Sequence, residues 1–120
     1  MKIFFTSKRT SSLQRKEIKQ ICLLKNTFWK YNLKNQLLWF NRNIKSNDIH
    51  NMIKFREKIL GYTCLRKRTF LLNNKKEKYL LFDTLIISKK LRGKKISKLL
   101  MSFNNNIIIK NKKISFLFCK

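Results

Sequence analysis

The stretch that decides the fold is Tyr79–Phe103, which reads YLLFDTLIISKKLRGKKISKLLMSF. Its first part, Tyr79–Ile87, is a dense apolar run, rich in β-branched and aromatic residues and about as long as one buried strand. A polar, cationic turn follows at residues 88–95. The pattern then changes to the i, i+3, i+4, i+7 spacing of one helix face, at Ile96, Leu99, Leu100 and Phe103.

A strand, a basic turn and a helix in this order are typical of a phosphate-binding site. The first backbone N–H groups of a helix have no partner within the helix, and the helix dipole gives them a partial positive charge. Arg92, Lys94 and Lys95 add full positive charges near the same point. The alternative is a basic turn at a helix start that binds no phosphate.

At these residues the chain resembles the GNAT superfamily of N-acetyltransferases. In that family a central strand and a few polar residues precede an Arg/Gln-x-x-Gly-x-Gly/Ala motif, which opens a helix. Here Ile87 closes the strand, and the motif position reads Arg92-Gly93-Lys94-Lys95-Ile96-Ser97. Lys95 stands where the family usually has Gly, and Ser97 replaces a Gly or Ala. Leu60-Gly61-Tyr62 is similar to the apolar-Gly-aromatic triplet of the family's third strand.

The resemblance implies that the chain binds acetyl-CoA as a co-substrate. Backbone donors from Gly93 through Ser97, a span that includes Lys94, Lys95 and Ile96, would hold the pyrophosphate, with help from the Arg92 side chain. Main-chain groups of Leu85, Ile86 and Ile87 would pair with the pantetheine arm. The implied reaction transfers an acetyl group to an amine on a small molecule or a protein N-terminus, by direct attack.

Two side chains are candidates for the catalytic base. Asp83 lies in the predicted core strand, where burial of an unpaired carboxylate raises its pKa, and GNAT enzymes often draw a base from this strand. His50, the one histidine, stands two residues after Asp48, so both side chains would share one strand face and form a His–Asp pair. The alternatives are an Asp83 carboxylate paired with a lysine or arginine, and a His50 that is merely a surface residue. We find no metal-ligand cluster.

The first half of the chain predicts one strand and two helices. The strand is expected at residues 2–6, with a polar break at Lys8–Thr10. The first helix starts at Ser11 or Ser12, with a Ser11-x-x-Gln14 capping box, and its apolar stripe is Ile18, Ile21, Cys22, Phe28 and Trp29. The second helix starts at Asn32 and carries Leu33, Leu37, Phe40 and Ile44. These helices pack on a sheet or, alternatively, form an aromatic-basic surface for nucleic-acid bases, with Trp29, Tyr31, Trp39 and Phe40.

The second half predicts mostly strands. A period of two from Asp48 indicates a hairpin of strands 49–55 and 59–70, and Gly61 inside it indicates a bulge or a close backbone approach. A loop is expected at residues 71–78, the core strand at 79–87, and the helix from 96 to a break in the pattern at Asn104–Asn106. Residues 107–109 either continue the helix or form a short extension, and a last strand is expected at 114–119. The order β-α-α-β-β-β-α-β predicts an α/β (α+β) fold, a mixed, mostly antiparallel central sheet flanked by helices, in one domain over residues 1–120.

The family pattern continues beyond the last expected strand with another helix and two strands, which carry a tyrosine often used as a general acid. The chain ends directly after that strand, so we expect a C-terminally short GNAT-like domain. An inactive, truncated acetyltransferase relic is therefore one alternative. A homodimer that completes the missing strands is another expectation.

Charge points to a second class of function. Thirty Lys and Arg residues against five Asp and Glu residues give a net charge of +25, while 43% hydrophobic residues argue against disorder. This balance is typical of proteins that bind nucleic acid, at least nonspecifically, so a small basic RNA-binding protein is the other alternative. The abundance of Lys, Asn, Ile and Phe, with no Pro, indicates an AT-rich genome, which accounts for some of the lysines.

Cys22, Cys64 and Cys119 are odd in number and lack C-x-x-C spacing, which favours buried thiols in a reducing compartment over disulfides or a zinc site. Neither a signal peptide nor an apolar run long enough to cross a membrane is present in the sequence. We therefore expect a cytoplasmic protein without a membrane partner.

Overall fold

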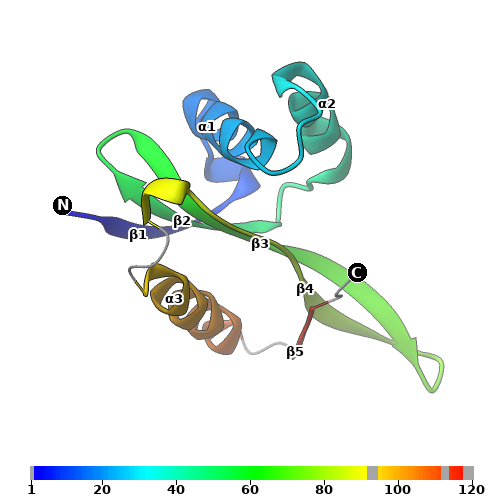
Figure 1. Cartoon of the computed structure of the whole chain (residues 1–120). Helices are drawn as coiled ribbons and strands as arrows, with labels where there is room; N and C mark the ends of the chain where they lie inside the picture. The colour runs from blue at the N-terminus through cyan, green and yellow to red at the C-terminus, as the bar shows by residue number, and fades with distance from the viewer. Residues whose placement is uncertain (1, 92–94, 112–113, 118–120) are drawn as a thin grey trace.

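A computed structural model describes residues 2–91, 95–111 and 114–117 of the chain. Its strands and helices follow the predicted order β-α-α-β-β-β-α-β (Figure 1). In sequence they are β1 (Phe4–Arg9), α1 (Arg15–Asn26), α2 (Leu33–Asn43), β2 (Ile49–Phe55), β3 (Lys58–Leu72), β4 (Lys75–Ile87), α3 (Ile96–Lys110) and β5 (Ile114–Leu117). Two short 3-10 turns, η1 (Thr10–Ser12) and η2 (Lys89–Leu91), join them.

The five strands form one mixed sheet in the order β1-β2-β3-β4-β5. Strands β1 to β4 pair antiparallel with one another, and β5 pairs parallel with β4. Helices α1 and α2 cover one face of the sheet, and α3 covers the other (Figure 1). The predicted mixed, mostly antiparallel sheet flanked by helices is therefore confirmed.

Apolar side chains fill the space on both faces of the sheet. On the α1–α2 face, Ile21 and Cys22 of α1 and Phe40 of α2 meet inward residues of the strands, which include Met52, Tyr62 and Ile86. On the α3 face, Leu91 of η2 and Leu100 of α3 meet Ile53 and Leu60 of the strands. Because each strand alternates its side chains between two covered faces, residues 49–53 are all buried.

The start of α1 differs from the prediction. Strand β1 continues through Lys8 and Arg9, where a break was expected, and η1 occupies the residues predicted to cap the helix. The capping box lies one turn later, at Gln14 and Glu17, where the Gln14 backbone N–H donates to Glu17 Oε1 at 2.9 Å. Helix α1 ends at Asn26, so Phe28 and Trp29 follow the helix instead of extending its apolar stripe.

The β3–β4 hairpin is longer than predicted. The turn consists of Asn73 and Asn74 alone, with φ of 51° and 64°, instead of a loop over residues 71–78. Asparagine adopts this left-handed conformation more readily than other residues with a side chain, and two such residues fit the twist of a two-residue hairpin. Lys75–Lys78 therefore belong to β4, and the hairpin extends well beyond the rest of the sheet (Figure 1).

Of the bulge and the close backbone approach that the sequence offered for Gly61, the structure has the bulge, and the close contact is with a side chain. The register between β2 and β3 shifts here, with Ile53 opposite Gly61 and Lys54 opposite Ile59. A Cβ atom on Gly61 would lie 2.7 Å from Ile53 Cδ1. A larger residue would therefore displace the Ile53 side chain from the core.

Helix α3 runs through Asn104–Asn106, where the sequence predicted a break. Asn104 is fully buried, and its Oδ1 accepts hydrogen bonds from Asn51 Nδ2 at 2.9 Å and Thr63 Oγ1 at 2.7 Å. These contacts to β2 and β3 outweigh the low helix propensity of asparagine. The last strand, expected at 114–119, is described as Ile114–Leu117, and residues 118–119 lie outside the described residues.

The helices that the structure describes are at most 15 residues long, and none combines the length and apolar character that a membrane span requires.

Candidate active site

The candidate site lies where β4 ends and α3 begins. The predicted coenzyme-binding residues fall on both sides of this junction: Leu85, Ile86 and Ile87 end β4, while Lys95, Ile96 and Ser97 begin α3. Arg92, Gly93 and Lys94, which were predicted to complete the site, lie outside the described residues. The junction is anchored by the Ser88 N–H, which donates to the Leu60 carbonyl at 2.7 Å, and by the fully buried Leu91 side chain.

A β-bulge at Asp83 divides β4 into two parts. Thr84 pairs with Cys64 and Phe82 with Leu65, so Asp83 is the extra residue. The bulge changes which side chains face which helix: Phe82 contacts the apolar cluster beneath α3, whereas Ile86 contacts the one beneath α1 and α2. A bulge also increases the local twist and bends the strand.

Past the bulge, one edge of β4 is open in the described structure. Strand β5 pairs with β4 only from Tyr79 to Phe82, and no described residue pairs with the edge of residues 83–87 that faces away from β3. In a strand, the backbone N–H and C=O groups of alternate residues point to this edge. Leu85 is 44% exposed beside it. An extended ligand can therefore add to β4 here and cover an exposed apolar side chain.

The N-terminus of α3 presents free backbone donors. Lys95 is the N-cap residue, and within the described residues no side chain caps the helix. The N–H groups of the first turn are therefore available to an anion, at the positive end of the helix dipole. Lys95 has φ of 58°, a left-handed conformation that glycine adopts without strain. The position where Lys95 departs from the family pattern is thus one where the backbone favours glycine.

The carboxylate of Asp83 lies at the surface, on the bulge. Of the two situations considered for Asp83, an unpaired carboxylate buried in the core and a carboxylate paired with a lysine or arginine, the structure has the second, because the bulge turns the side chain out of the strand interior. Asp83 Oδ2 forms an ion pair with Arg66 Nη1 at 3.5 Å. Arg66 also donates from Nη2 to the Asn43 carbonyl at 3.2 Å, at the end of α2. This pairing holds the Asp83 carboxylate on the α1–α2 side of the open edge.

Lys25 and Trp39 lie beside the Asp83–Arg66 ion pair. Lys25 was not among the site residues predicted from the sequence. Its side chain is 8% exposed, and Nζ lies 4.1 Å from the centroid of the Trp39 ring. The Arg66 guanidinium lies 5.6 Å from the same centroid. Burial lowers the pKa of Lys25. The sequence pattern could have indicated this burial. Lys25 is three residues after Cys22 and four after Ile21, so it lies on the apolar stripe of α1.

His50 lies in the core on β2 and is fully buried. Tyr62 Oη lies 2.5 Å from Nδ1 and Thr10 Oγ1 lies 2.7 Å from Nε2, and the ring stacks against Phe40 and Tyr62. Burial lowers the pKa of His50 to about 4. At neutral pH the ring is uncharged, and both nitrogens are already engaged.

The predicted His50–Asp48 pair does not form. The Asp48 carboxylate is also fully buried, and it accepts from the backbone N–H groups of Lys45 at 2.9 Å and Lys67 at 2.8 Å. Its third contact is Arg68 Nη1 at 3.4 Å. Asp48 precedes β2 instead of lying on it, so it joins the α2–β2 loop to β3.

The thiols of the described structure are not nucleophiles. Burial raises the pKa of Cys22 to about 11 and that of Cys64 to about 12, so both remain protonated at neutral pH. Within residues 2–91, 95–111 and 114–117, His, Cys, Asp and Glu side chains form no group of three that could hold a metal ion.

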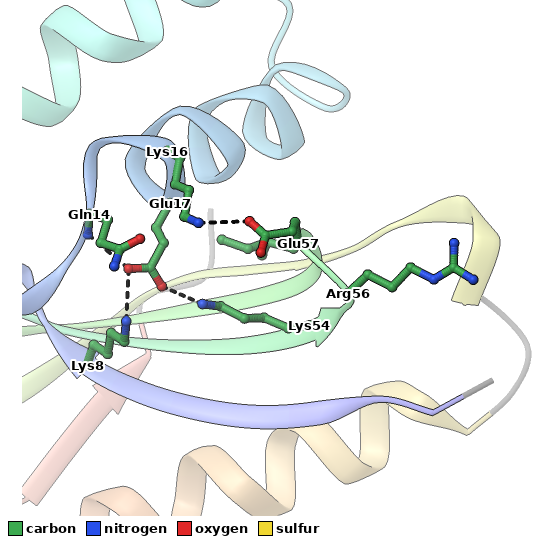
Figure 2. A pocket seen from close by; sticks show the side chains of 8 residues that line it. Lys8, Gln14, Lys16, Glu17, Lys54, Arg56 and Glu57 are labelled. Atoms are coloured by element: carbon green, nitrogen blue, oxygen red, sulfur yellow. Dashed lines mark hydrogen bonds and ion pairs between the residues drawn. The ribbon is translucent and has the colours of Figure 1, made fainter.

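A hollow of about 160 Å³ lies away from this junction, between the start of α1 and the β2–β3 turn (Figure 2). Lys8 and Lys54 point at the Glu17 carboxylate and bind one oxygen each, while Lys16 binds Glu57 at 2.8 Å. Burial alone would raise the pKa of Glu17, but the hydrogen bonds from the Gln14 backbone, Lys54 and Lys8 outweigh it and lower the pKa to about 2. The side chains that line the hollow form a network of ion pairs, and this network joins α1 to the sheet.

The sequence matches no protein-family model and no curated protein. Solved structures do match its fold. Escherichia coli ElaA superposes with a TM-score of 0.73 over 97% of this chain and 77% of its own, at 15% identity. A GNAT family acetyltransferase from Staphylococcus aureus superposes with a TM-score of 0.69 over 100% of this chain and 87% of its own, at 17% identity.

An aminoglycoside acetyltransferase from an uncultured soil metagenomic sample, in complex with sisomicin, gives a TM-score of 0.69 at 12% identity. The match covers 98% of this chain and 78% of that one. At these identities the likeness is one of fold.

Proposed function

This chain has the fold of the GNAT family acetyltransferases, and we propose that it transfers an acetyl group from acetyl-CoA to an amine. The observation that carries the proposal is the junction between β4 and α3. There the open strand edge after the Asp83 bulge leads directly to a helix N-terminus without a side-chain cap in the described residues. An extended chain that ends in a pyrophosphate has the shape and charge for both parts.

The described residues fit the coenzyme as follows. The pyrophosphate binds the free N–H groups at the start of α3, from Ile96 and Ser97 onward, with Lys95 beside it. The pantetheine arm pairs with the open edge of Leu85–Ile87, and the exposed Leu85 side chain packs on its apolar part. Arg92 and Lys94, outside the described residues, are proposed from the sequence to add positive charge.

The transfer is a direct attack of the amine on the thioester carbonyl. A C–N bond forms, the C–S bond breaks, and the coenzyme leaves as a thiolate. The amine must lose a proton, and we assign Asp83 as the acceptor of that proton, because its exposed carboxylate lies on the bulge beside the open edge. Arg66 acts as a positioning residue that holds the carboxylate in place. His50 has both ring nitrogens engaged in the core, so we assign it a structural role.

The acceptor approaches from the α1–α2 face, where Asp83, Arg66 and Trp39 lie together. Trp39 is 38% exposed and Trp29 is 44% exposed on this side. The acceptor is the amine of a small molecule or a protein N-terminus. The complex of the metagenomic relative with sisomicin makes an aminoglycoside one of the acceptors to test.

The first test is calorimetric titration of the protein with acetyl-CoA at ~150 mM salt, where exposed charges are largely screened beyond about 8 Å. ATP and a short RNA serve as polyanion controls. We expect micromolar binding of acetyl-CoA and weaker binding of both controls. Equal weak binding of all three ligands would show that the junction is only a cationic surface and would contradict the proposal.

A pair of matched variants locates the site. Arg92→Glu/Lys94→Glu places two negative charges at the proposed pyrophosphate site, and we expect it to abolish binding of acetyl-CoA. Lys19→Glu/Lys34→Glu makes the same change in net charge at exposed positions of α1 and α2, and we expect it to bind as the unaltered protein does. Unaltered binding by the first variant would disprove the site assignment.

A further inference from the structure

A second cationic region lies at the opposite end of β4, where β3 runs past the end of β2. Strand β2 pairs with β3 only as far as Ile49 opposite Leu65, and beyond that point β3 pairs with β4 alone. A groove of about 320 Å³ opens here, lined by Lys45, Asn47, Lys67, Arg68, Thr69 and Lys78. The lining comes from three elements: the α2–β2 loop, β3 and β4.

Positive charge dominates the lining of this groove. Four of its six lining residues are cations, and the nearby Asp48 carboxylate contacts two of them, at the Lys67 backbone N–H and at Arg68 Nη1. Asp48 is fully buried, already accepts two backbone hydrogen bonds, and balances one charge through Arg68. Three other carboxylates of the chain, those of Glu17, Glu57 and Asp83, are paired with lysine or arginine elsewhere.

The β3–β4 hairpin projects from the sheet (Figure 1). The pairing of its two strands shows that the cations continue along one of its faces. Thr69 stands opposite Lys78 and Leu71 opposite Lys76, so alternation places Lys76 and Lys78 on the face that carries Thr69. Glu77, the remaining acid of the chain, lies between them and therefore belongs to the other face. The result is a row of cations that starts in the groove and extends toward the turn.

We propose that this groove and hairpin face bind the phosphodiester backbone of a single-stranded nucleic acid. A small anion would contact two or three of these cations, whereas a polymer with one charge per residue can follow the whole row. The polar groups of Asn47 and Thr69 add hydrogen-bond donors for phosphate or sugar oxygens. The cations form one row along the hairpin, which matches the single phosphodiester chain of an unpaired strand. The surface lies at the far end of β4 from the proposed acetyl-CoA site, so the inference is independent of the proposed function.

The test compares two triple variants with the same net charge. Lys45→Gln/Lys76→Gln/Lys78→Gln removes three exposed cations from the groove and hairpin. Lys19→Gln/Lys30→Gln/Lys34→Gln removes three exposed cations from the α1–α2 layer, which also carries Trp29 and Tyr31. Because every altered side chain is exposed, we expect both variants to fold, which circular dichroism and acetyl-CoA titration will check.

The measurement is fluorescence anisotropy with labelled single-stranded RNA and DNA of ~12 nucleotides, over salt concentrations from ~50 to ~200 mM. We expect the groove variant to bind on the order of 10-fold more weakly at ~150 mM salt. Each lost phosphate contact lowers the salt slope by about 0.7, so the slope should fall by about 2. The α1–α2 variant should keep most of its affinity and its slope. The RNA and DNA arms show whether the 2′-hydroxyl contributes.

Equal weakening by the two variants would overturn the proposal, because it would show binding by net charge alone. Loss confined to the α1–α2 variant would overturn it in favour of the helical aromatic face. Tighter binding to a duplex of the same length would contradict the single-strand assignment.

Leu71 and Leu72, 69% and 56% exposed at the hairpin tip, allow one more control. If Leu71→Asn/Leu72→Asn weakens binding to anionic phosphatidylserine vesicles, and the vesicles bind more tightly than RNA, the hairpin is a membrane-docking element.

Discussion

Asp83 lies at the surface on the bulge of β4, with its carboxylate 3.5 Å from the Arg66 guanidinium. His50 lies two strands away on β2, fully buried between the rings of Phe40 and Tyr62. Both side chains face the α1–α2 layer, and both were predicted to act as a catalytic base. Asp83 can be reached by a substrate, whereas His50 cannot.

The difference comes from the neighbours of each residue in the sheet. At Asp83 the strand gains an extra residue, which disrupts the alternation and turns the side chain outward. At His50 the alternation is regular, and the strands on both sides are paired, so the ring points into the core. A polar side chain is tolerated in the core when its hydrogen bonds are satisfied. Here Thr10 and Tyr62 provide partners for the two ring nitrogens of His50. The same comparison yields a ranked set of predictions.

The largest expected effect is on stability. His50→Ala removes a ring packed against two aromatic residues and breaks its contacts with Tyr62 Oη and Thr10 Oγ1, of which Thr10 Oγ1 keeps a hydrogen bond to the Asp48 carbonyl at 3.3 Å. We expect the free energy of unfolding to fall by roughly 3 to 5 kcal/mol, the sum of a cavity and the lost hydrogen bonds. Denaturant unfolding followed by the fluorescence of Trp29 and Trp39 measures it. Acetyl-CoA affinity of the folded fraction should persist, and its selective loss at unchanged stability would place His50 in the active site.

The second prediction concerns pH. Because the pKa of His50 is about 4 in the folded protein and about 6.5 in an unfolded chain, the folded state binds fewer protons between these values. The contribution of His50 is fully present above the unfolded pKa and is lost as pH falls toward about 4. We expect a loss of roughly 2 kcal/mol between pH ~7 and pH ~5.

Unfolding titrations at a series of pH values check this slope. The measurements stop at pH ~5 because Glu17 also affects stability at lower pH. Its pKa is about 2 in the folded protein and about 4.3 in an unfolded chain. His50→Phe cannot bind a proton, so it should remove the slope between pH ~7 and pH ~5. A slope that persists in this variant would mean that another group is responsible.

The third prediction concerns activity. Asp83→Asn keeps the size of the side chain but removes its ability to accept a proton. We expect kcat/KM for acetyl transfer to fall on the order of 100-fold, the lower part of the range for a general base. The ion pair with Arg66 is only partly buried, since the Arg66 side chain is 16% exposed and that of Asp83 27%, so the free energy of unfolding should fall by no more than about 1 kcal/mol.

Thiol release from acetyl-CoA in the presence of an amine acceptor measures the rate, and titration measures coenzyme affinity. Glu57→Gln is a control for the loss of one carboxylate charge, since Glu57 is also paired with a single cation, Lys16, at a more exposed position. Equal rates for the unaltered protein and Asp83→Asn, at saturating coenzyme, would exclude Asp83 as the base.

The order of elements could be predicted from the sequence, because it depends on periodicity. The apolar run at Tyr79–Ile87, the stripe of α2 from Leu33 and the strand glycine Gly61 are all local patterns. Features that depend on distant partners could not be predicted. Asn104 belongs to a helix because Asn51 and Thr63 bind it, and these partners are 53 and 41 residues away.

The candidate site shows the same limit. The β4–α3 junction was predictable, since a strand, a basic turn and a helix are contiguous in sequence. The bulge at Asp83 was not, because it results from the register between β3 and β4. The surroundings of Lys25 also depend on tertiary structure, since Trp39 comes from α2 and Arg66 from β3. What the sequence did contain was a lysine on an apolar stripe.

The smallest expected effect concerns the backbone at the junction itself. Lys95 has φ of 58°, a conformation that costs a residue with a Cβ roughly 1 to 2 kcal/mol, whereas glycine adopts it freely. Glycine loses more entropy on folding, so we expect Lys95→Gly to stabilise the protein by only about 0.5 kcal/mol. Lys98→Gly, one turn into the same helix, should destabilise it by about 1 kcal/mol. Unfolding curves in denaturant compare the two variants. Opposite signs would show that the family's glycine position is set by the backbone; a loss of stability in both would mean that the Lys95 side chain makes a favourable contact that outweighs the strain.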